Sequence, residues 1–187
     1  MNSTVIFILR SAIDIYATIL LIRLLLQLVQ ANFYSPASQM IFKVCAPVVE
    51  PLAKILPTFG TFNSAALVAA ILVKWSFYLI MMAFAAVSMS EILVYLAVAA
   101  FELLRTLIEI YFWGIFVLVI SSWVGTTSHP TVLLVSQIIE PYMRPFRKFI
   151  PPIGMIDISP MAAIFTLMII RAQVLPMLGG LIQPFLS

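Results

Sequence analysis

A spacing of prolines and one glycine occurs twice in the chain, at one constant offset. The first copy consists of Pro47, Pro51, Pro57 and Gly60, with Asn63 after them. The second copy consists of Pro141, Pro145, Pro151 and Gly154, with Asp157 after them. Proline and glycine make up only about 5% and 7% of an average protein, so this shared register is improbable by chance. We therefore predict a tandem repeat, with residues 1–94 as the first unit and residues 95–187 as the second.

A second stretch repeats upstream of the prolines. LRSAIDIY, Leu9–Tyr16, matches LRTLIEIY, Leu104–Tyr111, at an offset one residue different from that of the prolines. One residue has therefore been gained or lost between the two patterns. In this alignment a base and an acid four positions later recur, at Arg10 and Asp14 and again at Arg105 and Glu109.

Few polar residues are available to cover a water-exposed surface. Of the 187 residues, 64% are hydrophobic and 9% are charged, and the mean hydropathy is +1.17. Soluble domains carry about 25% charged residues, so a soluble globular domain is excluded. The apolar runs are long and do not alternate as barrel strands do, which indicates membrane-spanning helices.

Four apolar segments are long enough to cross a bilayer as helices. They lie at about residues 4–29, 64–87 and 159–180, with one before the last that ends near Trp123. The start of this third segment is undefined, because the apolar stretch from Ile92 is longer than one span needs and leaves room for an interfacial extension. The N-terminal stretch lacks a basic region before its apolar run, so we expect a retained helix rather than a cleaved signal peptide.

Each repeat has a more polar segment between its two spans, at residues 32–62 and 125–158. Polar residues recur there at steps of three, four or seven, which is typical of an amphipathic helix at the membrane surface. A proline inside a helix removes a hydrogen bond and clashes one turn back. We therefore expect a helix to end near Pro47 and a short turn of helix to start at Pro51. Pro57 and Gly60 are expected to turn the chain back into the bilayer.

The predicted fold is an all-α membrane protein with four transmembrane helices in two repeats. The repeats are parallel in orientation because each contains an even number of spans. Each repeat is an α-hairpin with a Pro-broken amphipathic interfacial segment. Asn63 or Ser64 is the expected N-cap of the second span, and Ser159 and Pro160 are the expected N-cap and first residue of the fourth.

Basic residues of the connecting segments predict the orientation. The short turn and both tails hold no Lys or Arg, whereas the connecting segments hold Lys43, Lys54, Arg144, Arg147 and Lys148. By the positive-inside rule these segments face the cytoplasm and both termini the outside, although Arg10 and Arg105 lie near the opposite end. The five residues either bind anionic lipid headgroups or a cytosolic partner, at roughly 1 kcal/mol each, or only set the topology.

Six charged residues fall well inside the predicted spans: Arg10, Asp14, Lys74, Arg105, Glu109 and Arg171. Each costs about 2.5–3.5 kcal/mol at a helix centre, so such residues face the helix bundle or a wet cavity. One hypothesis is two pseudo-symmetric clusters, one in each repeat, that line an ion or proton path. The other is a structural lock, in which a base and an acid four residues apart neutralise each other and the remaining base pairs across helices. The excess of bases over acids argues against a cation path.

Two further charged residues are expected nearer the membrane surfaces. Arg23, toward the end of the first span, is expected to extend to the interface. Glu102 is expected at the outer interface, where it needs no function. Asp157 is expected to be a turn or cap residue rather than a catalyst.

Residues for catalysis or metal binding are scarce. The chain has one cysteine, Cys45, and one histidine, His129, so a His/Cys metal site within a single chain is excluded. No metalloprotease, serine-hydrolase or phosphate-loop motif occurs. We therefore expect no enzyme, no cofactor, no metal site and no nucleic-acid partner.

The spacing P-x3-P-x5-P-x2-G, read with Asp157-Ile158-Ser159-Pro160, resembles that of the YggT family of small bacterial and plastid membrane proteins. The resemblance covers nearly the whole chain. The first copy departs from the family pattern, with Ala53 where the pattern favours arginine and Asn63-Ser64-Ala65-Ala66 in place of its Asp-x-Ser-Pro end. If the basic surface acts through its number of charges, the first repeat is the weaker half.

This resemblance implies a role in tolerance of osmotic or potassium stress, while relatives in other lineages are associated with division, nucleoid placement or membrane-complex assembly. We therefore expect a multi-pass protein of the bacterial inner membrane that acts in ion, foremost potassium, or osmotic homeostasis. Four helices rarely enclose a pore alone, so this function requires a homo-oligomer. The alternative is a non-transporting scaffold or assembly factor that acts on a membrane-protein partner through its surface segments. A stable monomer in lipid would favour that alternative.

Overall fold

The computed structural model describes residues 2–84, 91–151 and 157–182 of the chain. Gly154, one of the predicted turn residues, lies outside these ranges. The elements in chain order are α1 (Ser3–Leu28), α2 (Pro36–Ala53), β1 (Thr58–Phe59), β2 (Phe62–Asn63), α3 (Ser64–Ala83), α4 (Ile92–Val124), α5 (Pro130–Phe149), α6 (Ser159–Ile169), η2 (Ile170–Val174) and α7 (Leu175–Ile182).

Four helical stretches are long and apolar enough to cross a membrane: α1, α3, α4 and the continuous run from Ser159 to Leu181. This confirms the predicted class, a helical membrane protein with four candidate spans. The third span begins at Ile92 and continues without interruption to Val124, where Gly125 with a φ of 76° ends it. Its 33 residues measure roughly 50 Å, so α4 crosses a hydrocarbon core of about 30 Å with a large tilt or extends beyond it.

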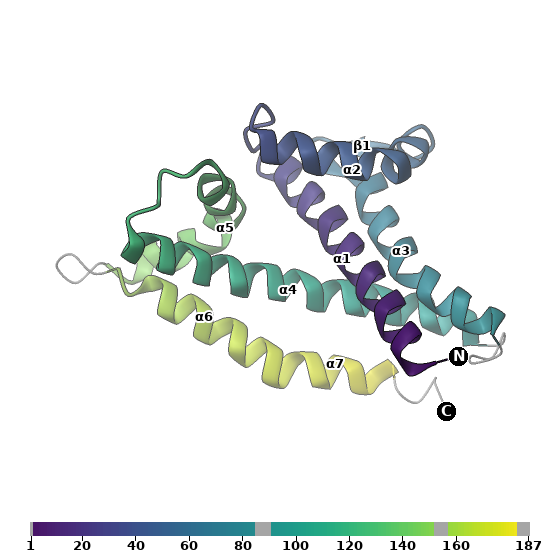
Figure 1. Cartoon of the computed structure of the whole chain (residues 1–187). Helices are drawn as coiled ribbons and strands as arrows, with labels where there is room; N and C mark the ends of the chain where they lie inside the picture. Colours follow the sequence, from purple (N-terminus) through teal and green to yellow (C-terminus); the bar gives the residue numbers. More distant parts are fainter. Residues whose placement is uncertain (1, 85–90, 152–156, 183–187) are drawn as a thin grey trace.

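Figure 1 shows α1 and α3 side by side, with α2 lying across their ends. Helix α4 packs against both near the N-terminus and runs away from them toward α5, with α6, η2 and α7 along its length. The buried core has two main parts, one around Leu20, Val49 and the alanines of α3, the other around Ile115 and Ile139 of α4 and α5. The alanines of α3 let helix backbones approach closely, which favours association of helices in membranes.

The prediction that prolines break the surface segments is wrong. Helix α2 continues through Pro47 and Pro51, and α5 continues through Pro141 and Pro145. In each helix the two prolines are four residues apart and exposed, so both lie on the outward face. The carbonyl groups that lose an amide partner therefore also face outward, where water or lipid headgroups can bond to them.

The turn after α2 is a hairpin of β1 and β2 that begins directly after Pro57. Gly60 has a φ of 61° in this turn, a left-handed conformation that glycine adopts without steric strain. The Asn63 side chain accepts a hydrogen bond from the backbone N–H of Ala66 at 3.0 Å. Asn63 is therefore the N-cap of α3, as one of the two predicted candidates.

The corresponding end of α5 is followed by Pro151, and α6 begins at Ser159 with Ile158 at its capping position. The helix thus begins at the residue predicted to cap it. Asp157 explains the difference, because its carboxylate accepts a hydrogen bond from the Ser159 backbone N–H at 2.9 Å. The Ser159 hydroxyl is buried and has no hydrogen-bond partner among the described residues.

The fourth span contains one π-helical turn, η2, between α6 and α7. The Leu175 backbone N–H bonds to the carbonyl of Ile170, five residues back. Pro176 follows directly, and its ring cannot fit against the carbonyl four residues before it in a regular α-helix. The wider turn accommodates this proline and contains Arg171 near the middle of the span.

Arg23 does not extend to the interface as expected. It is 9% exposed, and its guanidinium lies under α2, 5.0 Å from the centre of the Phe42 ring. Its Nε and Nη1 have no hydrogen-bond partner within the described part of the chain. Because α2 covers this end of α1, the side chain cannot extend outward.

Candidate functional site

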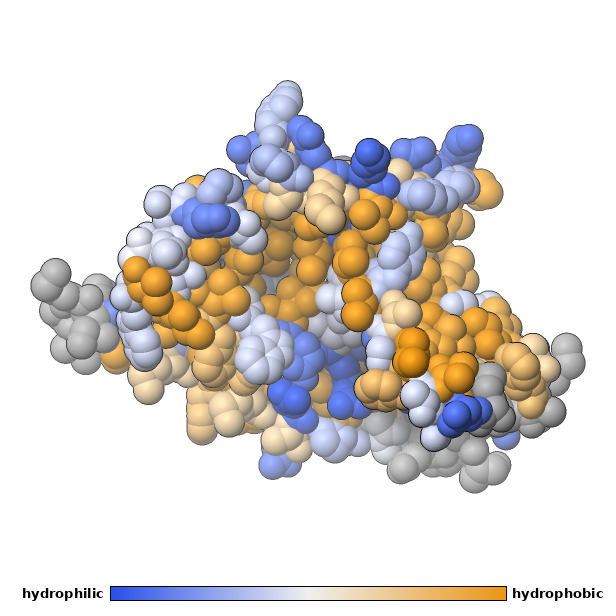
Figure 2. Space-filling view, viewed as in Figure 1, coloured by the Kyte–Doolittle hydropathy of each residue, from blue (hydrophilic) through white to orange (hydrophobic). Residues whose placement is uncertain are grey.

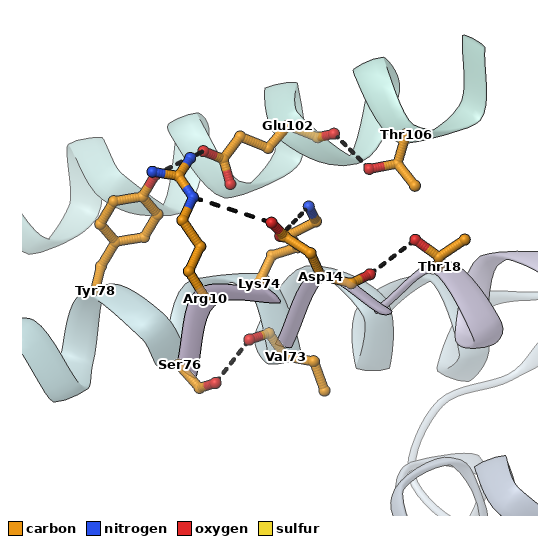
Figure 3. A network of polar contacts seen from close by, with 9 residues as sticks. All are labelled: Arg10, Asp14, Thr18, Val73, Lys74, Ser76, Tyr78, Glu102 and Thr106. Carbon is orange, nitrogen blue, oxygen red and sulfur yellow. Dashed lines mark hydrogen bonds and ion pairs between the residues drawn. The ribbon is translucent and has the colours of Figure 1, made fainter. Parts of the chain in front are cut away.

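The centre of the site is an ion pair between α1 and α3 (Figure 3). Lys74 Nζ lies 2.6 Å from Asp14 Oδ1, and Lys74 is only 5% exposed. Both residues lie near the middle of their helices, so the pair is far from either membrane surface. The buried ammonium group is therefore compensated by one carboxylate of the neighbouring helix.

Helix α4 adds an acid that the sequence analysis assigned no role. Glu102 Oε1 accepts hydrogen bonds from Arg10 Nη2 at 2.8 Å and from the Tyr78 hydroxyl at 2.9 Å. Arg10 Nε also lies 4.0 Å from Asp14 Oδ2. Arg10 thus bridges the acids of α1 and α4, and the first predicted cluster gains a third helix.

The second predicted cluster forms only in part. Arg171 Nη2 lies 3.1 Å from Glu109 Oε1, and its guanidinium lies 5.8 Å from the centre of the Phe112 ring. Arg105 forms no ion pair among residues 2–84, 91–151 and 157–182. The expected neutralisation of Glu109 by Arg105 is therefore wrong, because the acid pairs with the arginine of η2 instead.

Residues of both clusters line one polar cavity of about 350 Å³ between α1, α3 and α4. Thr18 and Thr106 also line it, and their hydroxyls donate to carbonyls of their own helices, which leaves the oxygen lone pairs available. The two clusters, predicted as separate, therefore share a single cavity. Its charged lining residues are Arg10, Asp14, Lys74, Glu102, Arg105 and Glu109.

An apolar cavity of about 450 Å³ adjoins the polar one, between α1, α2, α4 and α5. The two cavities share Thr18, Thr106 and Glu109 as lining residues, so they are continuous along α4. Trp113, which is 60% exposed, also lines the apolar part. Together the two cavities form what we call the central cleft, polar near the middle of the spans and apolar toward α2 and α5.

The residues that the structure describes leave the polar part of the central cleft open. Figure 2 shows hydrophilic residues gathered in the middle of one face, with hydrophobic residues on both sides. The side chains of Arg10, Asp14 and Glu109, which line it, are 52%, 41% and 34% exposed. Charges exposed to hydrocarbon at this depth are strongly unfavourable. The cleft therefore requires water or another protein surface to cover it.

The predicted basic surface residues are all exposed on α2, on α5 or directly after α2: Lys43, Lys54, Arg144, Arg147 and Lys148. Arg147 Nη1 lies 2.6 Å from Glu140 Oε2, and Arg147 Nε lies 3.4 Å from Asp157 Oδ2. Burial disfavours the charged form of Asp157, but the hydrogen bond from the Ser159 backbone N–H and the charge of Arg147 outweigh it and lower the pKa of Asp157. Arg147 therefore pairs with acids near the end of its own helix. The other four bases form no ion pair within the described ranges and can bind an anionic partner.

The side chains of the site suit ion or charge binding rather than metal-thiolate chemistry. No group of three or more His, Cys, Asp or Glu placed to hold a metal ion occurs in the described ranges. Cys45 is fully buried in α2, and burial raises the pKa of its thiol, which Arg23 offsets only in part. The cleft instead offers carboxylate, hydroxyl, ammonium and guanidinium groups, which bind ions or opposite charges.

Comparison with known proteins finds relatives over nearly the whole chain. An Escherichia coli K12 protein named "Uncharacterized protein YggT" is 33% identical over 185 residues, covering 97% of this chain and 96% of that protein. A Pseudomonas aeruginosa protein named "Uncharacterized protein PA0392" is 34% identical over 183 residues, covering 97% of this chain and 93% of its own length. No solved structure matches the chain.

The family model described as CCB3/YggT matches two segments of the chain, residues 2–93 and 97–178. These segments lie within the predicted repeat units 1–94 and 95–187, whose exact boundaries stay a prediction. The family match and the relatives agree with the resemblance seen in the proline and glycine spacing. The chain is therefore a member of the CCB3/YggT family of membrane proteins.

Proposed function

We propose that the chain acts in ion or osmotic homeostasis, with potassium as the foremost ion, as a multi-pass protein of the bacterial inner membrane. On this proposal α2 and α5 face the cytoplasm and both termini face the outside, following the distribution of Lys and Arg. The chain is then not an enzyme and has no cofactor. The observation that carries the proposal is the polar cavity, which gathers six charged side chains near the middle of the spans. Ionisable groups at this depth typically mark ion or proton pathways.

The carboxylates would supply the ligands of a cation path. Asp14 binds Lys74 closely through Oδ1 and has only a 4.0 Å contact with Arg10 at Oδ2, while Glu109 binds Arg171 through Oε1. Each carboxylate therefore has further lone-pair positions. A cation that binds Asp14 weakens its attraction to Lys74, so ion entry is coupled to movement of that base. The hydroxyl oxygens of Thr18 and Thr106 offer further ligands at the point where the polar and apolar parts of the cleft meet.

A homo-oligomer is part of this proposal. Four helices rarely enclose a path alone, and the polar part of the central cleft is open on one face (Figure 2). Contact with further copies would replace hydrocarbon beside the half-exposed charges with protein or water. Association would therefore remove the unfavourable exposure of these charges to hydrocarbon that an isolated chain has in a bilayer.

Flux of potassium and sodium in proteoliposomes tests the proposal. The wild type is compared with Asp14→Asn, Glu109→Gln and with the control Glu50→Gln, an exposed acid of α2 outside the cleft. We expect the wild type and the control to conduct equally and the cleft variant to lose flux at matched amounts of folded protein. Absence of flux in the wild type would contradict the ion path.

A non-transporting scaffold or assembly factor is the second candidate function. It is favoured by the ion pairs, because every acid of the cleft already holds a base of the same chain. The exposed bases of α2 and α5 would then bind anionic lipid headgroups and a membrane-protein partner. A partner cross-linked through α2 or α5, in a chain that carries no flux, would support this candidate.

A further inference from the structure

We propose that a second copy of this chain covers the central cleft, and that Arg105 of each copy binds the Asp14 carboxylate of the other. The two copies are related by a two-fold axis along the membrane normal. This dimer is the homo-oligomer that the proposed function requires, and it rests on that proposal.

Arg105 is the base of the cleft that the described residues leave without an ion pair. Within the described residues, Arg10, Lys74 and Arg171 each have an acid at 3.1 Å or less, whereas Arg105 has no ion pair. Its side chain is exposed and lies between the polar cavity and a second cavity of about 440 Å³. An arginine inside a span is retained where a carboxylate or water reaches it, so this position suits a carboxylate from a second molecule.

Depth in the membrane decides which partner can supply the carboxylate. Arg105 lies well inside α4, and it shares its cavity with residues near the middle of α1 and α3. Phosphate groups of lipids lie at the membrane surface, outside the hydrocarbon core. A carboxylate on a second transmembrane helix can lie at the depth of Arg105, and a lipid headgroup cannot.

A second copy is favoured over another protein because this face is complementary to itself. A two-fold interface brings the same surface together twice, so it must carry both members of each pair. Asp14 is 41% exposed, and its Oδ2 is 4.0 Å from Arg10 Nε, longer than a strong charge-assisted hydrogen bond. This oxygen can therefore accept from Arg105 of the other copy, and an axis along the membrane normal keeps the two residues at one depth.

The apolar part of the central cleft extends the same interface. It lies directly along α4 from the charged part and exposes Trp113 and Val117 at its edge. Side chains of the second copy can pack there, which gives the interface an apolar region beside its charged anchor. Well-packed aromatic residues next to an arginine are a common arrangement in stable interfaces.

Energy transfer between donor-labelled and acceptor-labelled copies tests the contact between Arg105 and Asp14. It is measured in vesicles at several protein-to-lipid ratios. We expect the wild type to form dimers and Arg105→Gln to raise the dissociation constant roughly tenfold. Arg105→Lys should keep most of the affinity. At protein-to-lipid ratios where the copies are monomeric, thermal unfolding should be the same in both variants and the wild type, because Arg105 has no ion pair among the described residues to lose. A monomeric wild type, or an Arg105→Gln variant as dimeric as the wild type, would overturn the proposal.

Cross-linking in native membranes gives a second readout that leaves Arg105 in place. Cys45 is fully buried, so a flexible bismaleimide reports on one added cysteine. We expect Trp113→Cys copies to cross-link and Leu72→Cys copies to remain single. Leu72 is 37% exposed, lines neither part of the cleft, and lies two residues from Lys74, on nearly the opposite side of α3. The reverse pattern would place the interface elsewhere. Dimers without flux would contradict the ion path alone, and flux from monomers would contradict this interface alone.

Discussion

The two repeats carry the same base–acid pattern but compensate its charges to different extents. In the first repeat the base is buried. Lys74 is 5% exposed and lies 2.6 Å from Asp14. In the second repeat the pair is Arg171 with Glu109, whose side chains are 49% and 34% exposed. Similar sequence in two repeats therefore does not give similar electrostatics, because burial of the partners differs.

One position explains why Arg10 is compensated and Arg105 is not. Arg10 receives the carboxylate of Glu102 from α4. In the repeat alignment of LRSAIDIY with LRTLIEIY, the residue that matches Glu102 is Phe7. Helix α1 therefore has no acid at the position that corresponds to Glu102. In the second repeat, Arg105 therefore depends on a carboxylate of another molecule, as proposed above.

Removing the acid of each ion pair should give the largest difference in stability between the two repeats. Asp14→Asn leaves Lys74 as an uncompensated buried cation, which we expect to destabilise the fold by about 3–5 kcal/mol. Glu109→Gln leaves a half-exposed arginine, and with water in the open cleft to solvate it the cost should be about 1 kcal/mol or less. Thermal unfolding in lipid nanodiscs measures the difference. Equal losses in the two variants would contradict the contrast between the repeats.

A double variant separates the charge effect from the loss of the Asp14 side chain. Asp14→Asn, Lys74→Met replaces both partners with neutral groups of similar size. Such replacement of a buried ion pair is often neutral or stabilising, so thermal stability should return close to that of the wild type. A double variant as unstable as Asp14→Asn alone would show that the carboxylate has another structural role.

Packing between α4 and α5 should matter more in the second repeat than its exposed ion pair. A Cβ at Gly114 would lie 2.5 Å from the Cδ1 of Ile139, so Gly114→Leu overpacks this contact. We expect a loss of about 1–3 kcal/mol in the free energy of unfolding. Gly180→Ala in α7 is the control, because nothing lies within 4 Å of a Cβ there. If Gly114→Leu melts at the wild-type temperature, α4 and α5 are not tightly packed.

The residues that bond to the first turn of α3 and of α6 should differ in how their contribution to stability depends on pH. The pKa of Asp157 is lowered, so its contribution is fully present above about pH 4, the unfolded value, and disappears as the pH falls through the lower folded value. Asn63, its counterpart, carries no charge and should contribute equally at all pH values. Asp157→Asn should cost under about 1 kcal/mol at pH 7 and nothing at pH 2. Melting temperatures at the two pH values check this, and a cost that persists at pH 2 would refute the charge effect.

Much of the fold could be predicted because bilayer physics dictates it. Long apolar stretches gave the four spans, and Asn63 was a recognisable cap. The continuation of α2 through Pro47 and Pro51 was not predicted, because propensity rules treat each proline alone. Their spacing of four places both on the exposed face, where unpaired carbonyls are tolerated.

The candidate site could be predicted only in part. Arg10, Asp14 and Lys74 were predicted as one cluster, but Asp14 was expected to pair with Arg10 and its closest base is Lys74. Glu102 was missed because the start of the third span was undefined, although its spacing of three and seven residues from Arg105 and Glu109 places all three on one face of α4. The π-helical turn was signalled only by Pro176, and no local rule predicts its width.

Potassium flux through the folded Asp14→Asn, Lys74→Met variant decides whether the buried pair serves ion conduction, because this variant lacks the charges but is expected to keep the fold. We expect the wild type to conduct potassium in proteoliposomes and the double variant, at equal folded amounts, not to. Equal flux in both proteins would contradict this expectation and would make the buried pair a structural lock.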